Sequence, residues 1–162
     1  MKIKLSYLYV ALILFTLVSC AKEEITTATI DLRENVIGQY NFNIKTYIID
    51  IENKLNLSDS SISELKLNKA GAINEINFND LTGKIFVKGS NFSEITTATK
   101  GYKFDILNQE VDGVSYKGYN YFTVDGKGYH GNYNTASKKV FFAFTFKSND
   151  IDFVLTAEGT KK

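Results

Sequence analysis

The chain has 162 residues, of which 44% are hydrophobic and 14% aromatic, so the composition excludes a disordered protein and predicts one folded domain. The net charge is +1, and the 19 basic residues become 17, against 18 acidic ones, once Lys2 and Lys4 leave with the N-terminal segment described next. Such a near-neutral domain lacks the basic surface that nucleic acid requires. The single cysteine excludes an intramolecular disulfide and a thiolate metal site.

Residues 1–19 have the pattern of an export signal. Met1–Lys4 is short and basic, Leu5–Val18 is uncharged, and Leu17-Val18-Ser19-Cys20 resembles the bacterial lipobox, in which a small residue precedes the acylated cysteine. We therefore expect Cys20 to carry a covalent lipid and the domain to hold no other cofactor. The alternative is a retained membrane helix, which needs about 20 apolar residues. The stretch from Leu5 to Ala21 is shorter and is diluted by polar residues.

The residues after Cys20 bear on the destination of the protein. Ala21-Lys22-Glu23-Glu24 is similar to the export tag of surface lipoproteins of the Bacteroidota, although a solvated linker also explains it. No aspartate follows Cys20, so the usual signal for retention in the inner membrane is missing. We expect an outer-membrane protein, anchored by lipid and facing the cell exterior. Residues 20–35 are expected to form the acylated cysteine and a flexible tether.

From Gly38 onward the apolar residues alternate with polar ones, which is typical of half-buried strands. After Thr46 the alternation changes parity to Tyr47, Ile49 and Ile51, which predicts a β-bulge. The other alternating apolar residues are Tyr40, Phe42, Ile44; Leu65, Leu67; Ile76, Phe78; Ile85, Val87; Tyr102, Phe104, Ile106; Val140, Phe142, Phe144, Phe146; and Ile151, Phe153, Leu155, Ala157.

Turn sequences lie between these segments. Asp112-Gly113 and Asp125-Gly126 are hairpin signals, and residues 134–137 and 148–150 are polar breaks. Residues 55–63 are predicted as the one short helix. The break at 148–150 is so short that the last two strands must form a hairpin, with Phe144 and Leu155 facing the same interior.

These elements predict an all-β fold: a single antiparallel up-and-down β-barrel of about eight strands over residues 36–162, with a β-sandwich as the alternative. Val36-Ile37-Gly38-Gln39-Tyr40 resembles the start of lipocalin-like, or calycin-like, lipoproteins of the Bacteroidota, and residues 140–146 and 151–157 resemble their last two strands. The resemblance implies a small apolar ligand inside the barrel. The interior residues that would line it are Tyr40, Phe42, Phe104, Phe142, Phe144 and Phe153.

The sequence holds no catalytic constellation, so we expect no enzyme. His130 is the only histidine and is interpreted as a solvated strand side chain, and one histidine cannot build a zinc site. A catalytic triad stays open on chain order alone, because its members occur in any order, but no serine lies in a nucleophile elbow. Residues 149–152 are better explained as a polar turn than as a calcium loop. The tyrosines and glycines of 114–133 predict cross-strand packing, with a sugar or protein partner as the alternative.

Two functions follow from these patterns. The first is a surface-anchored, lipocalin-like barrel that binds a small apolar ligand. The alternative is a non-catalytic interaction subunit of an outer-membrane protein assembly. The volume of the interior separates the two, because a barrel of about eight strands either fills its interior with side chains or holds one small ligand.

Overall fold

The computed structural model describes residues 30–96, 100–124 and 126–162, and residues 31–162 form one compact unit. The predicted signal peptide and Cys20 lie outside the described residues. No helix within the described ranges is long and apolar enough to cross a membrane.

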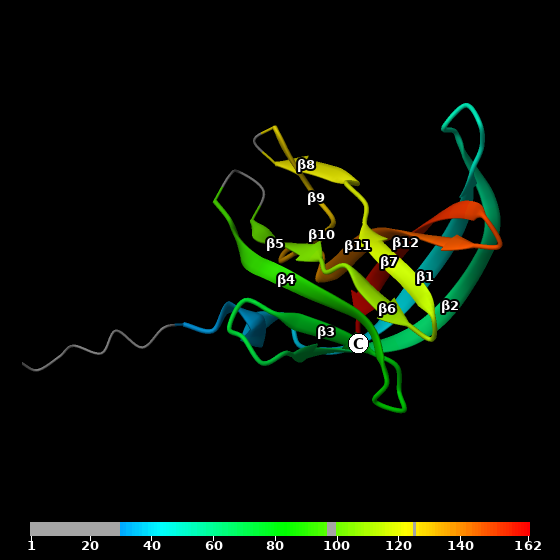
Figure 1. Ribbon diagram of the computed structural model, residues 1–162. Helices are drawn as coiled ribbons and strands as arrows, with labels where there is room; N and C mark the ends of the chain where they lie inside the picture. The colour runs from blue at the N-terminus through cyan, green and yellow to red at the C-terminus, as the bar shows by residue number, and fades with distance from the viewer. Residues whose placement is uncertain (1–29, 97–99, 125) are drawn as a thin grey trace, which may run out of the picture. The chain divides into compact units, whose positions relative to one another are not determined.

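Strands make up nearly all of the regular structure (Figure 1). A single turn of 3-10 helix, η1 (Leu32–Asn35), precedes them. The strands of the described residues are β1 (Gly38–Ile49), β2 (Leu55–Lys69), β3 (Ile76–Asn79), β4 (Ile85–Ile95), β5 (Gly101–Ile106), β6 (Gln109–Val111), β7 (Val114–Gly118), β8 (Phe122–Val124), β9 (Lys127–Tyr129), β10 (Gly131–Asn134), β11 (Lys139–Ser148) and β12 (Ile151–Lys161).

Eight of these strands form a hydrogen-bonded ring. The order is β1-β2-β3-β4-β5-β10-β11-β12, and β12 returns to β1. Every pairing is antiparallel, and each strand of the ring lies beside the next one in the chain. The predicted all-β, up-and-down arrangement of about eight strands is therefore confirmed. Residues 107–130 are an insertion between β5 and β10, in which β6 and β7 extend the sheet beside β11 and β8 pairs with β9.

Two of the predicted turns have hairpin geometry, whereas Asp125 of a third lies outside the described residues. Asp112 and Gly113 have φ of 52° and 78°, and Asn149 and Asp150 have φ of 49° and 63°. Positive φ at both central residues gives a two-residue turn whose backbone twist matches the twist of the two strands that it joins. Short polar side chains and glycine tolerate this conformation best, which explains the residue types at these four positions.

The final hairpin has the predicted register. Val140, Phe142 and Phe144 face inward and are buried, and Phe144 lies opposite Leu155. Phe146 lies opposite Phe153 nearer the turn, and both are half-buried. Ile151 is 44% exposed because it follows the turn directly, beyond the last interior layer.

Two sequence expectations are wrong. Residues 55–63 form part of β2 and not a helix, because β1 supplies a backbone partner for this segment along its whole length. The bulge occurs where it was predicted, but the extra residue is Ser58 of β2, since Thr46 pairs with Asp59 and Tyr47 with Leu57. β1 itself keeps its parity against β12, so Tyr47 and Ile49 lie on the outer face of the ring.

The folded unit also begins earlier than the expected boundary at residue 36. Asp31 caps η1 by accepting a hydrogen bond from the Arg33 backbone N–H, and Arg33 is only 6% exposed. The Arg33 guanidinium donates to the carbonyls of Ala70, Ala72 and Glu75 in the loop between β2 and β3 and forms an ion pair with Asp31 at 2.8 Å. These contacts attach residues 31–35 to the end of the ring, so they are not part of a tether.

Candidate binding surface

Of the six residues predicted to line an interior ligand site, all but Phe153 belong to the buried core. These five, namely Tyr40, Phe42, Phe104, Phe142 and Phe144, have an exposed fraction of zero. A cavity large enough for a water molecule would expose part of the side chains that line it. These five side chains expose nothing, so none of them borders such a cavity. Phe153 differs, being half-buried and stacked on Phe146 with ring centroids 5.0 Å apart.

Direct contact between aromatic rings fills this interior. The centroid of Phe78 lies 4.5 Å from that of Phe142 and 5.7 Å from that of Phe104, and Phe42 lies 5.5 Å from Phe142. Glycines opposite the rings make room for them. A Cβ at Gly131 would lie 2.3 Å from the Phe104 ring, and one at Gly159 would lie 2.6 Å from that of Phe42. Five of the six predicted residues thus belong to a packed core.

Residues 31–36, which contain η1, close one end of the ring. Tyr40 is fully buried there, and its hydroxyl donates to the Val36 carbonyl just after η1. Burial raises the pKa of Tyr40 well above its usual range, so the hydroxyl keeps its proton. Nearby, the hydrogen bond from the Arg33 guanidinium holds the pKa of Asp31 well below its usual range. The ion pair at this end is therefore present at neutral pH.

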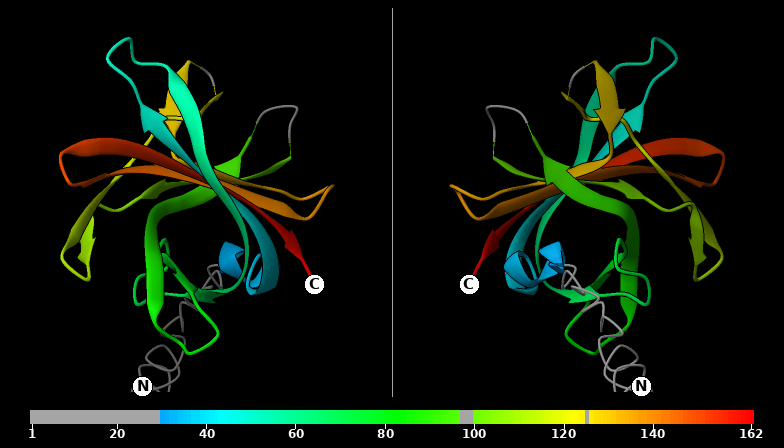
Figure 2. Two further views of the ribbon diagram at one scale, coloured as in Figure 1. Left: turned by 90° about the vertical axis from the view of Figure 1, so that its right-hand side faces the viewer. Right: turned by 90° about the vertical axis from the view of Figure 1, so that its left-hand side faces the viewer.

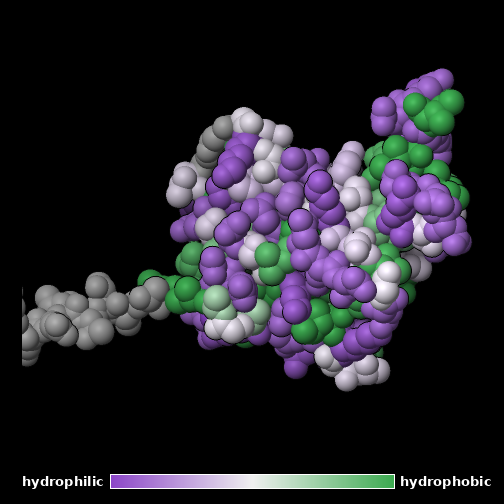
Figure 3. All heavy atoms as spheres, in the orientation of Figure 1, coloured by the Kyte–Doolittle hydropathy of each residue, from purple (hydrophilic) through white to green (hydrophobic). Residues whose placement is uncertain are grey.

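The other end, which we call the mouth, is formed by the turns between β1 and β2, β3 and β4, β6 and β7, and β11 and β12. Viewed from this end, the four hairpins spread apart (Figure 2, left). Five large aliphatic side chains are exposed on them: Ile51 at 101%, Leu81 at 62%, Leu57 at 60%, Ile151 at 44% and Leu55 at 38%. In Figure 3 the β1–β2 tip at the upper right is mostly hydrophilic with one hydrophobic group, and further hydrophobic residues lie just below it.

An open cleft of about 570 Å³ lies between the tips of the β1–β2 and β11–β12 hairpins. Ile48, Ile49, Ile51 and Ile151 supply its apolar part, and the polar lining residues are Asp50, Asn53, Asp150 and Asp152. Asp50 holds the β1–β2 turn by accepting hydrogen bonds from the N–H groups of Glu52 and Lys54. The Lys54 bond is the main reason that the pKa of Asp50 is lowered. The described residues contain no cluster able to hold a metal ion.

A second mouth cleft, of about 230 Å³, lies between β4 and the β6–β7 hairpin. Phe86 and Tyr116 form its aromatic wall, and Lys84 pairs with Asp112 across it at 2.5 Å. Burial raises the pKa of Tyr116. Beside Tyr116, both polar atoms of the Gln109 side chain are buried, with no hydrogen-bond partner among the described residues. A buried amide in this condition costs free energy unless a further group pairs with it.

The His130 side chain is fixed by contacts with the protein, whereas the sequence predicts a solvated side chain. Its Nδ1 accepts a hydrogen bond from the Ile106 N–H at 3.0 Å, and its ring packs so closely on Gly118 that a Cβ there would lie 2.1 Å from Nδ1. The side chain is 22% exposed, so it is partly buried and not simply solvated. Because Nδ1 accepts from the backbone, the imidazole ties β5 to the start of β10 and offers only Nε2 to other groups.

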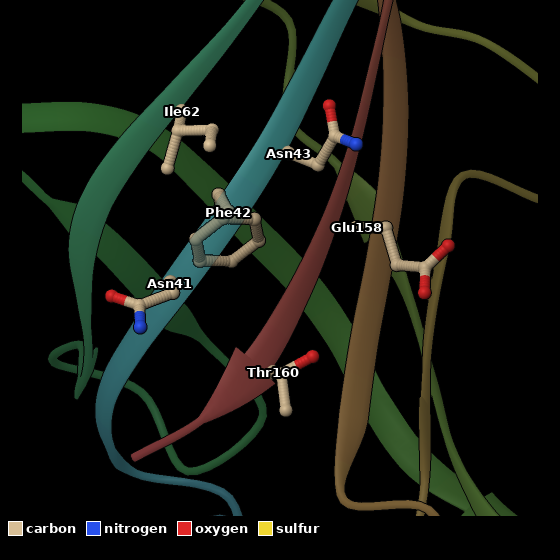
Figure 4. Close-up of a pocket in the computed structure, with 6 residues that line it drawn as sticks. All are labelled: Asn41, Phe42, Asn43, Ile62, Glu158 and Thr160. Carbon is tan, nitrogen blue, oxygen red and sulfur yellow. The ribbon is translucent and has the colours of Figure 1, made fainter.

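The outer face of β1, β2 and β12 carries a shallow pocket of about 250 Å³ (Figure 4). Its rim is polar, with Asn41 and Asn43 on β1 and Glu158 and Thr160 on β12. Ile62 of β2 stands at one side and is 83% exposed. The sequence does not single out Ile62, because residues 55–63 are predicted to form a helix. In the strand that forms instead, Ile62 lies on the outer face, where polar residues are expected.

A scan against protein-family models and searches of curated proteins and of solved structures find no match to this chain.

Proposed function

We propose that this protein is a non-catalytic interaction subunit, anchored to the outer membrane through a lipid on Cys20 and facing the cell exterior, which binds a partner protein with its mouth. The supporting observation is a contrast in burial. Five predicted ligand residues have no exposed surface, whereas five aliphatic side chains at the mouth are exposed. Two of these side chains, Ile51 and Ile151, line one cleft. Exposed apolar groups that share a surface mark interaction sites more often than groups scattered singly.

The chemistry of the mouth supports a protein partner. An apolar centre with a polar rim is the usual composition of a protein–protein interface. The aspartates at positions 50, 150 and 152 border the apolar cleft, so a partner surface with an apolar centre and basic residues around it is the complementary one. The net acidity of this rim also disfavours direct insertion of the tips into an anionic membrane surface.

The test uses thiol labelling in intact cells. Cys20 is the only natural cysteine and its thiol is consumed by acylation, so Ile51→Cys carries the only free thiol of the mature chain. A membrane-impermeant maleimide photo-crosslinker should label this variant on intact cells and, after illumination, join it to one discrete protein. Ile73→Cys is the matched control, because Ile73 is 53% exposed in the loop beside η1. It should be labelled but give no such product.

Two results would contradict the proposal. Absence of labelling at both positions on intact cells would exclude the exterior location. Equal crosslinking from both positions, or none from Ile51→Cys, would exclude the mouth as the binding surface.

One feature of the structure, the buried Gln109 amide, supports a small-ligand function. The Gln109 amide, which has no partner among the described residues, lies opposite Tyr116 in the β6–β7 pair. Tyr116 lines the aromatic cleft and Gln109 does not, so a small amphipathic ligand would have to reach past Tyr116 to pair with the amide. In this second candidate, the ligand binds at the mouth and not among the filled interior side chains. Gln109→Leu would then abolish the binding of any lipid that co-purifies with the protein, whereas it would leave partner crosslinking through Ile51→Cys unchanged.

A further inference from the structure

The longest strand of the ring has an open edge. β2 pairs with β1 from Leu55 to Leu67, but on its other side it pairs with β3 only from Lys66 to Lys69. β3 has four residues, and the chain then enters the β3–β4 turn. The edge of β2 over residues 55–65 therefore has no strand partner within the described residues. Its backbone N–H and C=O groups are a template for another strand.

This edge carries little of the protection that exposed strand edges usually have. Natural proteins block such edges with lysine, proline or a bulge. Residues 55–65 contain no lysine and no proline, their charged residues are Asp59 and Glu64, and the only bulge is at Ser58. From Asp59 to Leu65 the edge is uninterrupted for seven residues, and three of them are serine, whose short side chains let another strand approach.

Ile62 is the midpoint of this seven-residue segment. Its side chain lies on the outer face, opposite Asn43 of β1, and is 83% exposed (Figure 4). In an antiparallel pairing of two identical strands about a two-fold axis, the central residue meets its own copy. The most exposed apolar residue of β2 therefore stands at the position where self-pairing would cover it.

We propose that a second copy of this chain pairs with the β2 edge, antiparallel and centred on Ile62. In this register Ile62 lies opposite Ile62 of the second copy, Ser61 opposite Ser63, Ser60 opposite Glu64, and Asp59 opposite Leu65. No two like charges face each other directly, and cross-strand pairs of β-branched residues stabilise a sheet. The pairing joins the sheets of two rings into one continuous sheet.

This dimer goes beyond the proposed function and does not depend on it. The proposed pairing uses residues 59–65 of β2, whereas Leu55 and Leu57 are the residues of this strand that belong to the mouth, so either can fail without the other.

Disulfide crosslinking in membranes, with the full chain, tests the register. Directly opposed residues in an antiparallel pair have Cα atoms about 4.5–5.5 Å apart, which is within the range that a disulfide requires. Ile62→Cys should therefore give a crosslinked dimer on mild oxidation, and the unsubstituted chain should not. Ser60→Cys is the matched control on the same strand. Its two copies would be offset by four residues, or about 13 Å along the strand, and should not crosslink.

A mixed experiment separates this register from random collision. Ser60→Cys and Glu64→Cys expressed together should give a mixed dimer, whereas each alone should not. Adding Ile62→Lys to both should abolish the mixed dimer, because two ammonium groups would then face each other. This substitution should leave the thermal midpoint nearly unchanged, because the Ile62 side chain is exposed.

The proposal is overturned if Ile62→Cys crosslinks no better than Ser60→Cys. It is also overturned if the mixed pair gives no more dimer than the single variants, or if the dimer persists with Ile62→Lys. Crosslinking of Ile62→Cys to a different protein, in place of its own copy, would assign the edge to a foreign strand and would equally reject the dimer.

Discussion

Truncation of Phe144 tests how much the packed interior contributes to the stability of the domain. Its side chain has no exposed surface, and its ring lies 4.9 Å from that of Tyr116, 6.1 Å from Phe86, and 6.3 Å from both Phe142 and Phe146. Phe144→Ala removes the transfer free energy of the ring and leaves a cavity among these neighbours, which costs roughly 3–5 kcal/mol.

The expected change in the thermal midpoint follows from the size of the domain. The entropy of unfolding is about 2.1 cal/mol/K per residue, and the unit spans Asp31–Lys162. Each kcal/mol therefore lowers the midpoint by roughly 3–4 °C, so Phe144→Ala should lower it by roughly 10–18 °C. The total free energy of unfolding of such a domain is only about 5–15 kcal/mol, so a denaturant titration should show the loss as well.

Phe141→Ala is the control on the opposite face of β11. Phe141 is half-buried and packs on Tyr121, with ring centroids 4.5 Å apart. Its loss should cost about 1–2 kcal/mol, since one aromatic contact and partial burial are removed. If Phe141→Ala lowers the midpoint more than Phe144→Ala does, the strand has the opposite register and the assigned interior is wrong.

Three further predictions concern the N-terminal side of the domain. Arg33→Met should lower the free energy of unfolding by about 3 kcal/mol in a denaturant titration, because Asp31 and three backbone carbonyls lose their partner; Arg33→Lys should not restore it, and full stability with methionine would refute this role. The Arg33 hydrogen bond lowers the pKa of Asp31 from its ordinary value of 3.8. The contribution of Asp31 to the free energy of unfolding is therefore present above pH 3.8 and is lost as the pH falls below it. Asp31→Asn should flatten the dependence of the thermal midpoint on pH between about pH 5 and pH 3, and an unchanged slope would contradict the assignment. Cys20→Ala should abolish the incorporation of labelled palmitate and leave the melting curve of the domain unchanged, and label retained in this variant would refute lipidation at Cys20.

The sequence predicted the parts of the fold that depend on local alternation and turn chemistry. Phe142 and Phe144 were assigned to the interior because side chains alternate across a strand. The turn at Asn149 and Asp150 was recognised because these residues tolerate positive φ. Together they fixed the register of the final hairpin, in which Phe144 meets Leu155.

The errors lie where a distant partner decides the local structure. Residues 55–63 have weak alternation, and only pairing with β1 makes them a strand. Arg33 looked like part of a tether, because its carbonyl partners are about 40 residues further along the chain. The candidate surface was missed for a similar reason. Ile51, Leu81 and Ile151 are single apolar residues near separate turns, and only the ring brings their hairpins to one end.

Native mass spectrometry of the full chain, extracted from its host cells in mild detergent, tests most directly whether the interior is filled by side chains. The packing of Phe42, Phe104 and Phe142 predicts a mass equal to the acylated chain or its protein complexes, with no additional small molecule. A small apolar molecule bound at one per chain, released on denaturation and retained in Gln109→Leu, would contradict the account, because it would have to occupy space that the aromatic side chains fill.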